Sequence, residues 1–123
     1  MSADIPPELR GRGAVMLGFA ESAAADGEHF FYVRIPESIG PLDRGDRYEV
    51  SLQDALTAME LGRITGGGSQ LGAGGTIAYC GLDVIVTDHD RGLALIRETM
   101  RRLGAPATTV IEEYLPVYHE YEL

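Results

Sequence analysis

Three acids and one histidine that could bind a metal ion lie close together in the sequence. They are Asp83, Asp88, His89 and Asp90. Carboxylate oxygens with one imidazole would suit Mg²⁺, Mn²⁺ or Zn²⁺. However, residues 88–90 also lie where a helix is expected to begin, and acids at that position cap free N–H groups and complement the helix dipole. We therefore favour helix capping over metal binding and predict no metal site.

A second candidate is the glycine-rich segment 62–75, in which seven of fourteen residues are glycine. Consecutive backbone N–H groups can bind phosphate, but a phosphate loop leads into a helix, whereas this segment leads toward an expected strand. We favour a bulged or closely approached strand at Gly66-Gly67-Gly68, with a hairpin turn at residues 72–75. If a polar pocket forms here instead, its predicted ligand-binding residues are Arg63, Thr65, Gly66, Gly67, Gly68, Ser69 and Gln70.

The C-terminal stretch 112–122 contains four acids, three tyrosines and no basic residue except His119. Tyrosines are enriched at binding hot spots, and an acidic rim would steer a basic partner. The alternative is that these tyrosines pack against the protein's own sheet. The predicted partner-binding residues are Glu112, Glu113, Tyr114, Tyr118, Glu120, Tyr121 and Glu122.

No recognisable catalytic set accompanies these candidates. The serines lack the sequence contexts of known nucleophiles, and the three histidines are scattered along the chain. The single cysteine, Cys80, lies in an apolar run and is interpreted as a small buried residue. We therefore predict a protein that is not an enzyme and that needs no cofactor.

Charge and composition indicate which kinds of partner the protein can bind and in which cellular compartment it is expected. The chain has 19 acids against 10 basic residues, a net charge of −9, and a length of 123 residues that suits a single domain, 1–123. A net negative field repels nucleic acid and attracts basic surfaces. No apolar run approaches the roughly 20 residues of a membrane helix, and one cysteine fits a reducing compartment. We expect a cytoplasmic protein that binds neither nucleic acid nor membranes.

Two helices are expected from their end signals and apolar spacing. The first is predicted to begin at Ser51, with Asp54 completing a capping box, and to end at Gly62. Its apolar stripe would be Leu52, Ala55, Leu56 and Met59. The second is predicted to begin near Asp88 and to end at Gly104. Its apolar stripe would be Leu93, Ile96, Met100 and Leu103.

Strands are expected at residues 29–35, 63–71, 76–87 and 108–114. With the two helices they give the order βαββαβ, which predicts an α+β, ferredoxin-like, two-layer sandwich with a mainly antiparallel sheet. The apolar run 14–20 is interpreted as an extra N-terminal strand, because it is too short for a secretion signal. Residues 117–122 are expected to form a short C-terminal strand or tail, and residues 1–12 a flexible arm.

Two functions follow as hypotheses. The first is a small acidic, non-enzymatic interaction module, regulatory or inhibitor-like, that binds a basic protein partner through the C-terminal region. The alternative is a small-molecule sensor or accessory domain that uses the glycine-rich segment at a dimer interface. A homodimer is expected in either case, because such sheets leave one face and both edges open.

Overall fold

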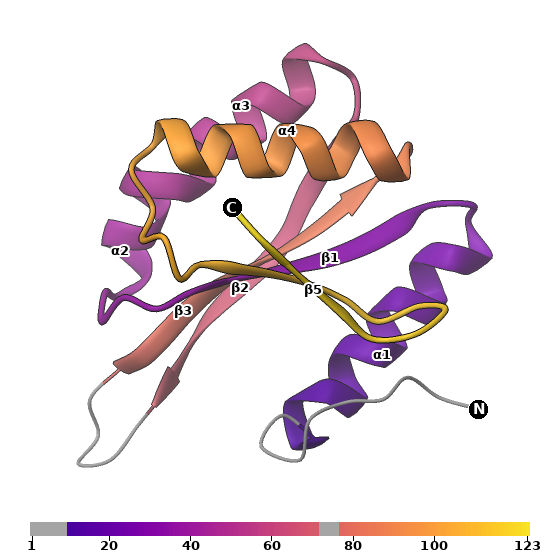
Figure 1. Ribbon diagram of the computed structural model, residues 1–123, viewed down its shortest axis with the longest axis horizontal. Coiled ribbons are helices and arrows are strands. Elements are labelled where there is room, and N and C mark those ends of the chain that lie inside the picture. The colour runs from indigo at the N-terminus through magenta and orange to yellow at the C-terminus, as the bar shows by residue number, and fades with distance from the viewer. Residues whose placement is uncertain (1–9, 72–76) are drawn as a thin grey trace.

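The computed structural model describes residues 10–71 and 77–123 and is built around one five-stranded antiparallel sheet (Figure 1). The strand order is β2-β3-β1-β4-β5. Every neighbouring pair is antiparallel. The strands are β1 (His29–Ile35), β2 (Gly62–Leu71), β3 (Ile77–Val86), β4 (Val110–Glu113) and β5 (His119–Glu122). The expected α+β class and the short C-terminal strand are confirmed.

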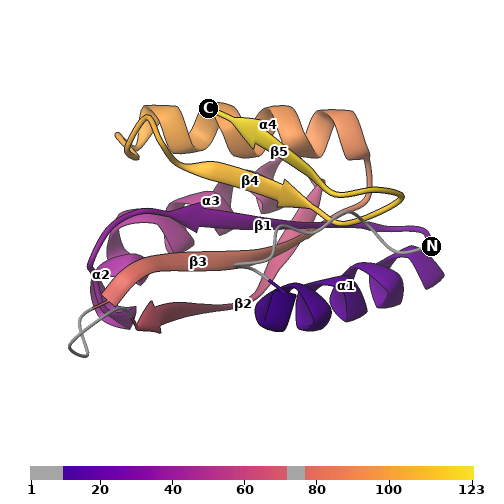
Figure 2. The same ribbon diagram turned by 60° about the horizontal axis from the view of Figure 1, so that its bottom comes forward.

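Helices lie on both faces of this sheet. They are α1 (Arg10–Ala25), the short α2 (Pro41–Arg44), the π-helical turn η2 (Gly45–Glu49), α3 (Val50–Ala58) and α4 (His89–Arg102). Helices α3 and α4 cover one face and α1 lies against the other, as the turned view in Figure 2 shows. None of the described helices is long and apolar enough to cross a membrane.

The main core lies between the sheet and the pair α3 and α4. Alternate residues of β3 face this core, and its buried side chains include Cys80, Leu82, Val84 and Val86. Helix α4 contributes the buried residues of its predicted stripe, Leu93, Ile96 and Met100. The alternation of apolar residues in β3 and their 3.6-residue period in α4 therefore identified, from sequence, the core-facing side of each element.

The ends of α4 agree with the sequence prediction. Asp88 is the N-cap, and its carboxylate accepts a hydrogen bond from the backbone N–H of Arg91. Gly104, just beyond the helix, has a φ of +78°, a conformation that glycine adopts without strain.

The prediction of an extra N-terminal strand at residues 14–20 is wrong, because this run belongs to helix α1. Met16, Ala20 and Ala23 recur at helical spacing and are buried against Phe30 and other residues of the sheet. A short apolar run does not distinguish a helix from a strand, and the alanines that follow it favour a helix. Residues 1–9 lie outside the described part of the chain, whereas residues 10–12 begin α1.

The expected helix start at Ser51 is also wrong. The chain is helical from Pro41 through Ala58, so Ser51 lies inside a helical stretch that begins ten residues earlier. Tyr48, Leu52 and Leu56 form its buried stripe. The stretch ends before Gly62, which already belongs to β2, and the turn between them is made by Glu60 at a φ of 52°.

The glycine-rich part of β2 contains the irregularity expected there. The register with β3 shifts between Ile64 and Gly66, which leaves Thr65 as an extra residue in a bulge, one position before the glycine run. The predicted hairpin turn at residues 72–75 lies outside the described residues.

Candidate functional site

Glu112, predicted to face a partner, is fully buried in an ion-pair network between the sheet and α1. Its carboxylate accepts hydrogen bonds from both terminal nitrogens of Arg12, at 2.7 and 2.9 Å, and from the Tyr114 hydroxyl at 2.5 Å. Arg34 pairs with it at 3.3 Å. The Arg12 guanidinium also lies 4.7 Å from the centroid of the Tyr32 ring. Glu112 and Tyr114 therefore hold α1 to the sheet and are not exposed.

Glu113 points to the opposite face of the sheet and pairs with α4. Its carboxylate lies 2.6 Å from Nε2 of His89 and accepts a hydrogen bond from the Tyr121 hydroxyl, also at 2.6 Å. Nδ1 of His89 lies 2.8 Å from Asp90. Burial by itself lowers the pKa of His89, but the hydrogen bond to Asp90 and the charge of Glu113 outweigh it, so the pKa lies above its usual value.

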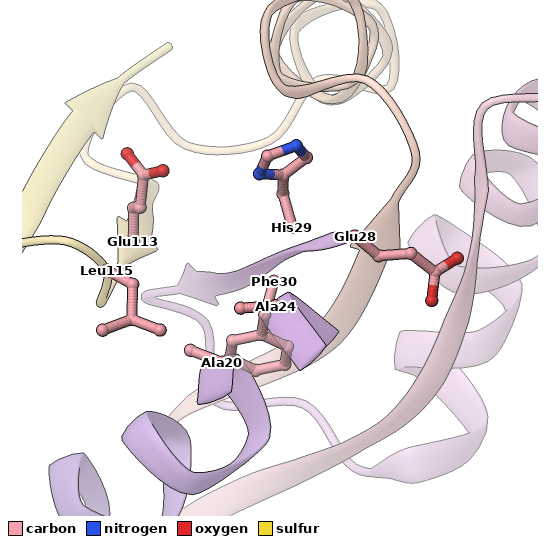
Figure 3. Close-up of a pocket in the computed structure, with 7 residues that line it drawn as sticks. All are labelled: Ala20, Ala24, Glu28, His29, Phe30, Glu113 and Leu115. Atoms are coloured by element: carbon pink, nitrogen blue, oxygen red, sulfur yellow. The ribbon is translucent and has the colours of Figure 1, made fainter. Parts of the chain in front are cut away.

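Glu113 also lines a small hollow, although His89 does not. It has a volume of about 40 Å³, which holds one or two water molecules. Figure 3 shows His29 and Glu113 on one side of it, with the carboxylate of Glu28 turned away from both. The walls come from α1, β1 and the end of β4, and the lining residues are Ala20, Ala24, Glu28, His29, Phe30, Glu113 and Leu115.

The remaining residues of the predicted C-terminal surface are less enclosed. Tyr118 donates to Glu120 at 2.8 Å, and its ring lies 5.1 Å from that of Tyr114. Tyr118 and Tyr121 are half-buried against the sheet, whereas Glu120 and Glu122 are exposed. The structure thus brings this predicted set onto β4, β5 and the connection between them but divides it between buried and exposed positions.

The residues predicted to form a glycine-rich ligand site do not share one face of the sheet. Arg63 pairs with Glu28 at 3.0 Å on the surface. A Cβ atom on Gly67 would lie 3.2 Å from the guanidinium of Arg44, whereas one on Gly66 would lie 3.1 Å from the carboxylate of Asp83. Gly67 is opposite the core residue Leu82, and Gly66 is opposite Asp83. Neighbouring glycines therefore serve opposite faces of the sheet.

Gly68 has open space around its Cβ position. Ser69 and Gln70 continue β2 opposite Cys80 and Tyr79 of β3.

The four residues with metal-binding chemistry do not converge on one point, although His89 and Asp90 are in contact. Asp83 lies on the α1 side of the sheet, Asp88 caps α4, and His89 lies between Asp90 and Glu113. Within residues 10–71 and 77–123, no three histidine, cysteine or acidic side chains converge in a way that could hold a metal ion.

A larger hollow forms where α1 crosses β2 and β3. Its volume is about 210 Å³, and it is lined by Phe19, Ser22, Thr65, Asp83 and Ile85. The sequence singled out Asp83 and Thr65 but not Phe19 and Ser22, because residues 14–20 were expected to form a strand and no helix was expected there. The one feature of the sequence that could have pointed to this hollow is the acid Asp83, which lies between the core residues Leu82 and Val84.

Comparison of the chain with known protein families, with curated proteins and with solved structures gave no match.

Proposed function

We propose that this protein is a small acidic interaction module that binds a basic protein partner and performs no catalysis itself. The observation that carries this proposal is the distribution of ion pairs. Outside α4, every arginine side chain that the structure describes is already paired with a carboxylate of the same chain. The pairs are Arg12 with Glu112, Arg34 with Glu112 and Glu120, Arg44 with Glu49, Arg47 with Glu37, and Arg63 with Glu28.

Four of the exposed acids that have no basic partner within the described chain lie on one helical stretch. Asp43, Asp46, Asp54 and Glu60 are exposed along α2, η2, α3 and the turn that follows. Leu42 and Val50 are exposed beside them, at 85% and 57%. Apolar side chains within an acidic field suit an interface that attracts a basic surface over a distance and then excludes water.

This location revises the hypothesis of a C-terminal binding surface. Glu112 and Glu113 are used inside the molecule, so only Glu120 and Glu122 of the predicted acids remain exposed there. We therefore assign the main steering charge to residues 41–60 and a smaller contribution to β5.

The partner is first isolated from the source cells by its binding to the immobilised protein. The test is then how the rate of association between the two proteins depends on salt concentration. We expect a partner with an isoelectric point above about 9 and an association rate that falls at least fivefold between 50 and 300 mM NaCl. Replacing Asp43, Asp46 and Asp54 by Asn and Glu60 by Gln should slow association at least threefold. We call this the four-carboxylate variant.

The matched control neutralises exposed charges of the opposite sign, Arg101→Gln with Arg102→Gln on α4. These changes should not slow association with a basic partner. An acidic partner, or an association rate that neither salt nor the four-carboxylate variant changes, would overturn the proposed function.

We also infer that the fold is ferredoxin-like. The order β2-β3-β1-β4, with a helical connection from β1 to β2 and another from β3 to β4, supports this topology. Helix α1 and strand β5 are then additions to the core.

A homodimer in the cytoplasm remains part of the proposal. Because α1 lies against the sheet face that was expected to be open, the contact would have to use a sheet edge, and β2 forms one edge of the five-stranded sheet. Light scattering of the eluting protein at 10–200 µM would show a mass of two chains, and a single-chain mass throughout would exclude this dimer.

A further inference from the structure

Asp83 is a half-buried carboxylate without a counterion in the described structure. It lies in the middle of β3, opposite Tyr32 of β1, on the face covered by α1. No basic side chain of the described residues forms an ion pair with it. Burial raises the pKa of Asp83, and the more distant charges of Arg44 and Arg12 offset this only in part.

Those two arginines form ion pairs with other acids. Arg12 holds Glu112 with two hydrogen bonds, and Arg44 pairs with Glu49. A carboxylate that loses part of its hydration on folding and gains no ion pair costs free energy. The chain keeps this acid between two core residues of β3, where an apolar or neutral side chain would avoid the cost.

The hollow around Asp83 has the other groups that a cationic side chain needs. Phe19, 44% exposed, places its ring on the α1 side, and Ile85 supplies apolar surface. Ser22 and Thr65 add hydroxyl groups that can accept hydrogen bonds. The absence of a side chain on Gly66 leaves room beside the Asp83 carboxylate, because a Cβ there would lie 3.1 Å from Oδ2.

We propose that this hollow, the Asp83 pocket, receives the side chain of an arginine from the basic partner. The guanidinium would pair with Asp83 and lie against Phe19, and its remaining N–H groups would donate to Ser22 and Thr65. The aliphatic stem would cover Ile85. A volume of about 210 Å³ is sufficient for the end of one long side chain but not for a folded segment.

Arginine fits these surroundings better than lysine. A guanidinium is more weakly hydrated than an ammonium group, stacks on aromatic rings and can form two parallel hydrogen bonds with one carboxylate. Buried arginines of this kind are frequent hot spots of protein interfaces. The inference rests on the proposed function and specifies where the partner is held after the acidic surface has attracted it.

The direct test is a titration of the ¹⁵N-labelled protein with N-acetyl-arginine methylamide, followed by amide chemical shifts. We expect saturable shifts at residues around Ser22, Thr65 and Asp83 with a millimolar dissociation constant. The citrulline analogue, which has the same shape without the charge, should bind at least tenfold more weakly. The lysine analogue should bind at least threefold more weakly.

Two variants and one control separate the pocket from general charge attraction. Asp83→Asn keeps the shape and removes the charge, so the thermal midpoint should stay the same or rise while arginine affinity falls at least tenfold. Phe19→Ala should weaken binding by a smaller factor. Glu21→Gln, which removes an exposed acid of α1, should leave the affinity unchanged.

Three results would overturn the Asp83 pocket. They are equal chemical shift changes with arginine and citrulline, shift changes confined to other residues, or an equal loss of arginine affinity in Asp83→Asn and Glu21→Gln. With the partner itself, Asp83→Asn should raise the dissociation rate, whereas the four-carboxylate variant should lower the association rate. If only the second effect occurs, the pocket is wrong and the proposed function stands. If arginine binds the pocket but the isolated partner is acidic, the proposed function fails.

Discussion

Adjacent glutamates in β4 have different structural roles because successive side chains of a strand point to opposite faces. Glu112 points toward α1 and meets Arg12, whereas Glu113 points toward α4 and meets His89. Both are buried, with exposed fractions of 0% and 7%. A buried carboxylate must be paired, so each of these acids fixes one helix against the sheet.

Glu112→Gln should therefore be strongly destabilising. The substitution leaves Arg12, which is 14% exposed, without its main counterion, and we expect a loss of about 3–5 kcal/mol in the free energy of unfolding. Urea denaturation followed by circular dichroism measures this. Glu122→Gln on β5 is the control and should change stability by less than about 0.5 kcal/mol. Similar effects for both variants would contradict a structural role for the Glu112 network.

The raised pKa of His89 makes part of the stability dependent on pH. The charged histidine is favoured in the folded state by Asp90 and Glu113, with His29 and Tyr121 also nearby. This contribution is fully present below the unfolded pKa of about 6.5 and is lost as the pH rises through the higher folded value. The unfolding free energy should decrease over this range, and His89→Gln should flatten the decrease. An unchanged slope in His89→Gln would assign the effect to another group.

Strand β2 contains glycines that other atoms approach closely and a glycine that has open space around it. Gly67 allows Arg44 and the backbone of β3 to approach, since a Cβ there would lie 2.8 Å from the carbonyl oxygen of Gly81. For Gly68, the next residue, no described atom outside its chain neighbours lies within 4 Å of the Cβ position. The prediction of a closely approached strand in this run is confirmed at Gly66 and Gly67.

Gly67→Ala and Gly68→Ala form a matched pair. The first should lower the free energy of unfolding by about 1–3 kcal/mol, because a backbone carbonyl cannot move aside as a flexible side chain can. The second should be within about 0.5 kcal/mol of the native protein, since alanine restricts the unfolded chain and meets nothing in the folded one. Thermal unfolding of both variants is the measurement, and equal effects would place the close approach elsewhere.

At the scale of the whole molecule, the charge of −9 is unevenly distributed. Helix α4 carries four arginines, Arg91, Arg97, Arg101 and Arg102, for which the described structure contains no ion pair, whereas residues 41–60 carry exposed acids. Repulsion among unpaired like charges destabilises the compact state and is screened by salt. The same field that would attract a basic partner therefore acts against folding when the protein is alone.

Stability should consequently rise with ionic strength. Between 10 and 200 mM NaCl we expect the thermal midpoint of the native protein to increase by about 2–5 °C. The four-carboxylate variant should show a smaller increase and a higher midpoint at low salt. A native midpoint that falls on adding salt would mean that attractive pairs, such as Arg63 with Glu28, outweigh the repulsion.

The sequence by itself determined the features that depend on neighbouring residues. The caps of α4, the alternation of β3, the strand at residues 29–35 and the irregularity near Gly66 all follow from local spacing and backbone preference. Predictions from local sequence were wrong where the same pattern of residues is compatible with two different secondary structures. The apolar run at residues 14–20 and the helical stretch before Ser51 are the two cases.

Only the tertiary structure decided which side chains meet. Arg12 reaches Glu112 across 100 positions of sequence, and α1 brings Phe19 and Ser22 over Asp83 of β3. Alternation along β4 implies that Glu112 and Glu113 face opposite ways, but the partner on each side depends on which helix covers that face. Such contacts depend on the long-range packing of the sheet and helices. They cannot be predicted from the spacing of residues within one segment.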